Sequence, residues 1–499
     1  MSPVYIVLSI VLYFSILLFI SWYTSRNATS ESYYLGNKQS PWFIVAFGLI
    51  GDSLSGVTFI SIPGAVTNDK FSYMQIVLGY LVGYFVIAKV LLPLYYRLNL
   101  TSIYSYLGQR FGDSSEKTGS FFFLLSRLIG AAFRLFISAT VLQIFIFDQW
   151  GIPFAVTSSI VIALILLYTY RGGIKTLVWT DSVQSIFLLL GVLLSIVVIA
   201  NTLDLGFIDL FTTIKNSPYS KVFFWDWQEK NFFFKQFFSG MFIAIVMTGL
   251  DQNMMQKNLS CKSLSDAQKN IYWFSSILIF VNLFFVTLGA LLYTYANAKG
   301  IAIPVKTDEL FPLLALNHLG VFASIVFVLG ITAATFSSAD SVLTTLTTSF
   351  CIDFLKMKSD KETSKEKKTR HIVHISFAVI LLMIIILFRE VNNDAVINSV
   401  FRAAGYTYGP LLGLFAFGLY TKISIKDKYV PIVCILAPII SYLVDTNSVR
   451  LFNGYKFGFE ILILNGLITF IGLYLLKKRN EEVHEIIRTG KVAGAKIEI

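Results

Sequence analysis

Long apolar runs recur along the whole chain, with short polar loops between them. Runs of about 17–25 apolar residues are long enough to cross a lipid bilayer as helices. Only 14% of the 499 residues are charged against 56% that are hydrophobic, too few charges to cover a soluble core of this size. We therefore predict an all-α polytopic membrane protein with about 13 transmembrane helices. The candidate spans lie near 3–23, 41–66, 73–96, 119–147, 152–170, 176–200, 235–256, 271–296, 319–348, 371–389, 394–420, 429–445 and 457–476.

The distribution of basic residues predicts how these spans are oriented. The chain has 40 Lys and Arg against 29 Asp and Glu, a net charge of +11, which in a membrane protein reports cytoplasmic loops rather than nucleic-acid binding. Basic residues gather at 356–370 and 422–428. A secretory signal requires basic residues before its apolar run, and none precedes the first span, so we expect this span to be retained as a helix. We expect one transporter domain over 1–476 and a cytoplasmic tail at 477–499. The predicted location is the plasma (inner) membrane, with an odd number of spans and the N-terminus outside.

Two predicted spans are interrupted at mid-depth by residues that weaken a helix. The second contains GDSLSG at 51–56 and the seventh contains TGLDQ at 248–252. Unwound backbone at this depth is tolerated only where it lines a cavity or a site, and matching interruptions in two halves of a chain indicate a transporter binding site. Their separation suggests two five-helix repeats, at about 41–200 and 235–420. Small-residue helix packing, the other interpretation of such glycines, fits GYLVG at 79–83 better.

The ninth span carries a stripe of small and hydroxyl-bearing residues beside one carboxylate. Ala334, Ser337, Ser338 and Ser341 are spaced i, i+3, i+4 and i+7, which places them on one helical face, and Asp340 flanks them. Hard cations take oxygen ligands, so this face predicts a cation site. Hydroxyls that only bond back to helix carbonyls are the alternative, and Asp340 favours the cation site over it.

Three more ionisable residues fall within predicted spans, where a charge costs about 2.5–3.5 kcal/mol on insertion scales. Asp181 begins the sixth span, so it is either a carboxylate favoured by the helix dipole or a cation ligand. Arg127 and Arg134 share a face of the fourth span. Arg127 can extend toward the cytoplasm, whereas Arg134 lies deeper and needs a carbonyl, an internal carboxylate or a solute carboxylate as its partner.

Several motifs, in order along almost the whole chain, resemble the sodium/solute symporter family, which includes bacterial sodium-coupled sugar and sialic acid carriers. The resemblance implies the LeuT-type fold, with inverted five-helix repeats formed by spans two to six and seven to eleven. It also implies that the first and sixth core helices are broken. The motifs are SYYLGNKQSPW, SLSGVTFISIPG, SIYSYLGQRFG, RGGIKTLVWTDSVQ, DQNMMQKNLSCKS, AATFSSADSVLTTLTTSFCIDF and YGPLLGLFAFGLY.

The resemblance further implies two sodium sites. The main site would take backbone carbonyls of Gly51, Leu54 and Ala334 and the hydroxyls of Ser337 and Ser338. A second site, as in members resembling sialic acid carriers, would take the side chains of Asp181, Ser337, Asp340 and Ser341. No organic cofactor is expected.

The positions that contact solute in the family match only in part. Polar or aromatic matches are Ser53, Ser55, Thr58 and Tyr73, and Arg134 lies one turn from the position of the arginine that holds sialic acid. At the other family contact positions the chain has Val77, Gly130, Ala244 and Met247. These departures disfavour both sugar and sialic acid, and leave a small polar or anionic organic solute as the predicted substrate.

The predicted function is sodium-coupled symport of that solute into the cell by alternating access, with a small-molecule solute and the lipid bilayer as partners. One alternative keeps the scaffold but couples transport to protons, which Asp52, Asp181 or Asp340 would carry. The other is a transporter-like sensor that binds solute without moving it. An enzyme is not expected, because the sequence shows neither a P-loop nor a catalytic or metal-binding constellation.

Overall fold

The computed structural model describes residues 3–26, 29–357, 363–391 and 396–478, and nearly all of these form helices. The all-α prediction is therefore confirmed, and the predicted tail lies outside the described residues from 479 onward. In the first half the helices are α1 (Pro3–Ser25), α2 (Ser30–Leu35), α3 (Trp42–Ser53), α4 (Gly56–Asp69), α5 (Tyr73–Val86), α6 (Leu92–Arg97), α7 (Ser105–Arg110), α8 (Asp113–Leu142), α9 (Phe154–Thr202) and α10 (Phe207–Asn216). In the second half they are α11 (Phe233–Ala244), α12 (Gln252–Asn258), α13 (Leu264–Ala298), α14 (Leu310–Asn317), α15 (Gly320–Ser349), α16 (Ser364–Val391), α17 (Val396–Thr407), α18 (Gly409–Tyr420), α19 (Val430–Thr446), α20 (Ser448–Leu451) and α21 (Ile461–Leu475).

Among the described residues, 8 helices are long and apolar enough to cross a membrane, or up to 10 if each of two bent pairs counts as one span. The bent pairs are α3 with α4, and α11 with α12. Three shorter apolar helices accompany them: Phe154–Thr169, Gly409–Tyr420 and Ile461–Leu475. The number of about 13 transmembrane spans stays a prediction.

The predicted fifth and sixth spans, 152–170 and 176–200, correspond to the two parts of α9, Phe154–Thr169 and Gly173–Thr202. The helix is kinked at Gly173, whose φ of 55° and ψ of −154° lie outside the helical region. Only glycine adopts such a conformation at little cost. A side chain at this position would also lie 2.5 Å from the Cα of Tyr33. A kink at Gly173 therefore separates the two spans, and α2 packs against α9.

Close packing of α5 against α11 explains the glycines of the GYLVG segment. A Cβ built on Gly79 would lie 2.0 Å from the carbonyl oxygen of Phe237, and one built on Gly240 would lie 2.1 Å from that of Ile76. Small residues allow helix backbones to approach this closely in membranes. The small-residue interpretation of GYLVG is confirmed.

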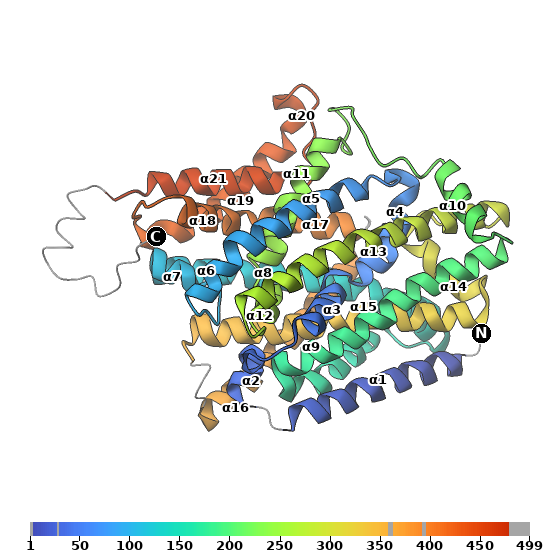
Figure 1. The fold of residues 1–499 in the computed structure, drawn as a ribbon, viewed down its shortest axis with the longest axis horizontal. Coiled ribbons are helices and arrows are strands. Elements are labelled where there is room, and N and C mark those ends of the chain that lie inside the picture. The colour runs from blue at the N-terminus through green and yellow to red at the C-terminus, as the bar shows by residue number, and fades with distance from the viewer. Residues whose placement is uncertain (1–2, 27–28, 358–362, 392–395, 479–499) are drawn as a thin grey trace, which may run out of the picture.

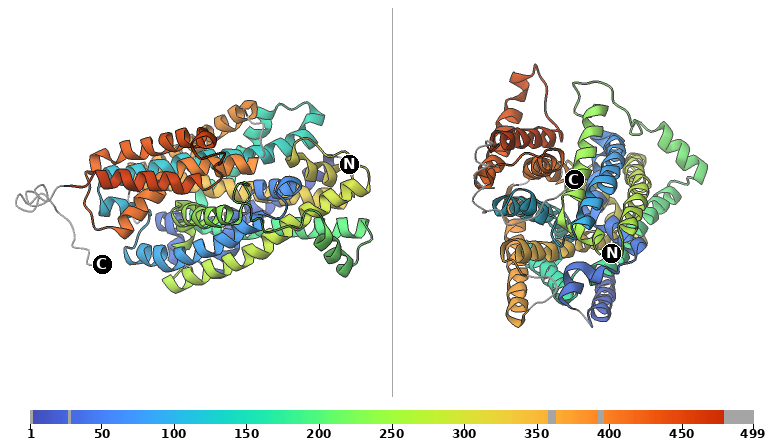
Figure 2. Two further views of the ribbon diagram at one scale, coloured as in Figure 1. Left: turned by 90° about the horizontal axis from the view of Figure 1, so that it is seen from above. Right: turned by 60° about the vertical axis from the view of Figure 1, so that its left-hand side comes forward.

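The helices lie roughly along the longest axis of the molecule, with α9 and α15 packed against each other in its interior (Figure 1). Helix α3 packs against α9, and α4 packs against α13. The described chain begins with α1 at one end of this bundle, and α21 finishes at the opposite end (Figures 1 and 2). These positions agree with an odd number of crossings.

Candidate functional site

The first helix break lies between α3 and α4, whose axes differ by 56°. Leu54, with φ −99° and ψ 82°, and the extended Ser55 separate the two helices. The sequence favours a break here because Gly51 and Gly56 weaken the helix and serine side chains compete for backbone hydrogen bonds. A helix that ends inside the bundle leaves carbonyl groups without intrahelical partners, and these can bind a cation. The predicted interruption of the second span is confirmed.

The second break lies between α11 and α12, at an angle of 66°. A π-helical turn over Ile245–Gly249 precedes it, and Asp251 begins the new helix. The Asp251 carboxylate accepts hydrogen bonds from the backbone amides of Asn253 at 2.9 Å and Met254 at 3.3 Å. It therefore caps α12. The predicted interruption of the seventh span is also confirmed.

At the predicted main sodium site, the first helix break lies close to α15. A Cβ built on Gly51 would lie 2.7 Å from the hydroxyl oxygen of Ser337 and 2.6 Å from that of Ser185 on α9, so only glycine leaves this space open. The Ser337 hydroxyl is buried and has no hydrogen-bond partner within the described chain. The neighbouring Ser338 hydroxyl donates to the carbonyl of Ala334 at 3.1 Å. Hydroxyl oxygens of α9 and α15 thus lie close to Gly51 of α3, and oxygen atoms are the ligands that hard cations take.

Asp181, Asp340 and Ser341, the predicted second-site residues, also lie together in the structure. The Ser341 hydroxyl donates to Asp181 Oδ2 at 3.1 Å. Asp340 accepts from the Tyr168 hydroxyl at 2.8 Å and from the backbone amide of Ser341 at 2.5 Å. Asp181 is fully buried in the interior of α9, so the interpretation as a carboxylate at a helix start is wrong. It follows that Asp181 needs a cationic or hydrogen-bonding partner.

That partner is Lys257 of α12, which the sequence-based prediction missed. Its ammonium group contacts Asp181 Oδ2, lies 2.5 Å from Asp52 Oδ2 and donates to the Ser341 hydroxyl at 2.8 Å. The side chain is 0% exposed. In the sequence, Lys257 stands in a polar stretch that reads as a loop, and only its place just after the second break signals a membrane-buried cation.

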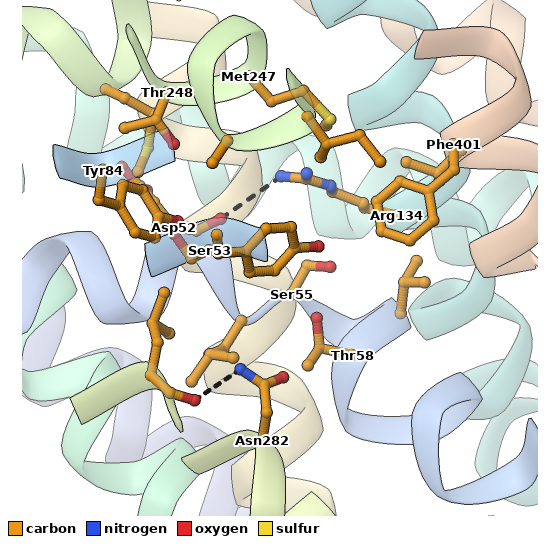
Figure 3. A pocket seen from close by; sticks show the side chains of 18 of the residues that line it. Asp52, Ser53, Ser55, Thr58, Tyr84, Arg134, Met247, Thr248, Asn282 and Phe401 are labelled. Atoms are coloured by element: carbon orange, nitrogen blue, oxygen red, sulfur yellow. Dashed lines mark hydrogen bonds between the residues drawn. The ribbon is translucent and has the colours of Figure 1, made fainter. Parts of the chain in front are cut away.

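The predicted solute contacts line one pocket between the two breaks (Figure 3). Figure 3 shows Arg134 extending from one side toward the backbone of Asp52, with Ser55 and Thr58 nearby. All five predicted residues belong to the lining: Ser53, Ser55, Thr58, Tyr73 and Arg134. The same pocket also has polar side chains that were not predicted: Tyr80, Tyr84, Thr248 and Asn282.

The two arginines of α8 have different surroundings. Arg127 Nε lies 2.5 Å from Asp251 Oδ2, which also accepts from the Tyr408 hydroxyl at 2.6 Å. Arg127 is only 5% exposed, so the interpretation that it extends to the cytoplasm is wrong. Arg134 makes one long hydrogen bond of 3.5 Å to the carbonyl of Asp52, and its Nε has no partner among the described residues. Arg127 therefore forms a structural ion pair with Asp251, whereas Arg134 presents its charge to the pocket.

Ala244 and Met247, two of the positions where the chain departs from the family, also line this pocket. They place apolar side chains where family members have an amide and an aromatic ring. The pocket therefore has no amide or aromatic side chain at these two positions.

The profile of the Sodium:solute symporter family matches residues 33–424. The chain belongs to the sodium:solute symporter family. The predicted family and the prediction of a sodium-coupled symporter are both confirmed, and the matched region contains both helix breaks and every predicted site residue.

Several relatives of this symporter are named as sialic acid or monocarboxylate transporters. It is 26% identical to the sodium/sialic acid symporter SiaT of Proteus mirabilis over 80% of this chain and 81% of that one. It is 24% identical to the sodium/sialic acid symporter NanT of Aliivibrio fischeri, with 80% of each chain covered. Human sodium-coupled monocarboxylate transporter 1 is 26% identical over 78% of this chain and 64% of that one.

A solved structure of a Na+-coupled sialic acid symporter in a substrate-bound outward-open state has the same fold as this symporter. The TM-score is 0.80 at 21% identity, and 95% of this chain and 98% of that chain are covered. The nucleobase-cation symporter Mhp1 in a closed conformation gives a TM-score of 0.55 at 14% identity. The predicted LeuT-type fold class is confirmed.

Proposed function

We propose that this symporter imports a small organic anion, most simply a carboxylate, together with sodium. The observation that carries this proposal is the Arg134 guanidinium, which is 9% exposed, lines the solute pocket and has no carboxylate partner among the described residues. A buried cation at membrane depth needs an anionic partner, and guanidinium binds carboxylate through two parallel hydrogen bonds.

The carboxylates nearest to Arg134 are already paired with other cations. Asp52 lies 2.5 Å from the ammonium of Lys257, and Asp251 lies 2.5 Å from Arg127. Neither carboxylate is available to neutralise Arg134 without losing its own partner. A solute carboxylate between Arg134 and the hydroxyls of Ser55 and Thr58 would supply the missing charge.

A second cavity supports an entry route for an anion. It shares Tyr73 and Phe401 with the solute pocket, so the two cavities meet at these side chains. Its charged lining contains Lys70, Lys230, Arg402, Asp69 and Asp445, and Lys230 pairs with Asp69 at 2.7 Å. The one basic group in excess would attract anions toward the pocket.

Sodium at the main site would couple ion and solute binding through α3. The proposed ligands are the carbonyls of Gly51, Leu54 and Ala334 and the hydroxyls of Ser337 and Ser338. Bound sodium would join the first break to α15. It would thereby hold Ser53 and Ser55, the residues on either side of Leu54, in place to bind solute. Coupling requires that ion and solute prefer the same conformation, and this shared contact supplies that preference.

We place the symporter in the plasma (inner) membrane as a single transporter domain over 1–476, with the N-terminus outside and the C-terminus in the cytoplasm. The two ends of the described chain lie at opposite ends of the bundle, which supports an odd number of crossings (Figure 1). The basic residues at 356–370 and 422–428 support a cytoplasmic C-terminus.

The experiment that tests the proposal is thermal unfolding of the purified protein in sodium, potassium or choline chloride, each with a panel of carboxylates, sugars and amino acids. A ligand that binds the folded state raises the melting temperature. We expect stabilisation by carboxylates, and only in sodium. Arg134→Gln should weaken carboxylate binding about 10- to 100-fold, because a hydrogen bond to a charged group contributes about 1.5–3 kcal/mol.

Arg450→Gln serves as the control, because Arg450 is exposed on α20. Stabilisation by neutral sugars alone, or equal carboxylate affinity in Arg134→Gln and Arg450→Gln, would reject the anion. Carboxylate binding with the same affinity in the presence and absence of sodium would instead support proton coupling or a sensor.

A further inference from the structure

The buried ammonium of Lys257 occupies the place that the family resemblance gives to a second sodium ion. It contacts Asp181 and Ser341, two of the residues predicted to ligate that ion. The third, Asp340, is engaged by the Tyr168 hydroxyl and the Ser341 amide. Each of these three side chains therefore already has a donor from the chain itself, whereas the fourth, Ser337, has no partner among the described residues and is also a ligand of the proposed main site.

We propose that Lys257 is a built-in cation that replaces the second sodium, so that this symporter binds one sodium ion, at the main site. The inference rests on the sodium coupling proposed above. An ammonium group and Na+ carry the same charge, and both are satisfied by oxygen atoms, but the lysine is attached to α12 and cannot leave.

The hydrogen bonding of Lys257 is complete. An ammonium group has three N–H donors, and Lys257 has three oxygen partners, on Asp52, Asp181 and Ser341. These partners come from the end of α3, from α9 and from α15, so one charge joins three helices at the first break. A bound sodium would hold the same helices together, which is why the lysine can take its structural role.

The charge of Lys257 is also needed by the two carboxylates that it contacts. Asp52 and Asp181 both lie against its single ammonium group. Removing Lys257 would leave two carboxylates with no cation, and buried charges of this kind are unstable without one.

The test is the number of 22Na+ ions bound by each purified, full-length chain at saturating sodium. We expect one ion in the wild type and two in Lys257→Ala, in which the vacated space is lined by Asp52, Asp181 and Ser341. The Hill coefficient for sodium should rise from about one to nearly two. Methylammonium should displace one of the two ions in Lys257→Ala and none in the wild type.

Two matched variants serve as controls. Lys257→Arg retains a positive charge and should bind one ion. Lys262→Ala removes an exposed lysine five positions later and should also bind one ion.

The outcomes separate this inference from the proposed function. Two ions in the wild type, or one ion in a folded Lys257→Ala, would overturn the inference and leave sodium coupling intact. No ion in the wild type with one in Lys257→Ala would reject sodium at the main site and retain the assignment of the lysine. If Lys257→Ala does not fold, the wild-type count decides: one ion supports the inference, and two overturn it.

Discussion

Ser337 is the residue at which the main sodium site can be tested with the least structural damage. Its hydroxyl has no partner among the described residues, so Ser337→Ala removes a proposed ligand and breaks no hydrogen bond within the protein. Loss of one ligand should cost about 1–1.5 kcal/mol. We therefore expect the sodium concentration for half-maximal binding to rise about tenfold, with little change in melting temperature without sodium.

Ser324→Ala is the matched control for this change. Ser324 is also buried on α15, but its hydroxyl bonds the carbonyls of Ala315 and Gly320, about 20 Å from Ser337 along the helix. Sodium affinity should stay at the wild-type value in Ser324→Ala. Wild-type affinity in Ser337→Ala as well would remove Ser337 from the site.

The residues of the site differ in how far the sequence could predict them. Ser337, Ser338 and Ser341 share a helical face, so their spacing alone places them together. The partners of Lys257 lie 205, 76 and 84 positions away along the chain, and no local pattern connects them. Tyr168 and Asp340 meet across 172 positions for the same reason. Residues joined only by tertiary packing could not be predicted from one sequence.

At the scale of elements, the close packing of α5 on α11 determines which side chains the structure tolerates in place of the glycines between these two helices. Gly79→Ala places a methyl group within 2.0 Å of the Phe237 carbonyl, so the two helices must separate. Overpacking of this kind costs about 1–3 kcal/mol. We expect a melting temperature several degrees below that of the wild type, measured by thermal unfolding in detergent with sodium present.

Gly130→Ala on α8 provides the comparison, because a Cβ at that position meets nothing within 4 Å. Alanine is also about 1 kcal/mol better than glycine inside a helix, so this variant should match or exceed the wild type in stability. Equal melting temperatures for Gly79→Ala and Gly130→Ala would show that α5 and α11 are not in close contact.

The elements themselves were predicted well where composition changes along the chain. Both helix breaks follow from glycine, serine and aspartate inside apolar runs, which is local information. The boundary between the fifth and sixth spans was also predicted, because a basic Gly-Gly segment interrupts the apolar run there. The kink at Gly173 lies close against Tyr33, more than a hundred residues earlier, and this contact could not be predicted from a local pattern.

At the scale of the whole molecule, the proposed orientation can be measured with introduced cysteines. The three native cysteines, Cys261, Cys351 and Cys434, are all buried, so they should give little background labelling. In intact cells, a membrane-impermeant maleimide should label Asn216→Cys, at the end of α10. It should label Lys365→Cys, in the basic first turn of α16, only after the cells are made permeable. The reverse pattern would invert the orientation.

The buried lysine also limits how strongly the carrier could concentrate its solute. One sodium ion and one monovalent carboxylate together carry no net charge, so each transport cycle would be electroneutral. The membrane voltage, worth about 2.3 kcal/mol per charge per 100 mV, would then contribute nothing to uptake. A tenfold sodium gradient could support about tenfold accumulation, since each factor of ten corresponds to about 1.4 kcal/mol. A carrier with two exchangeable sodium ions could reach the square of that accumulation ratio, and the membrane voltage would raise the ratio further. By replacing one sodium ion, Lys257 would make solute accumulation by this symporter independent of the membrane voltage.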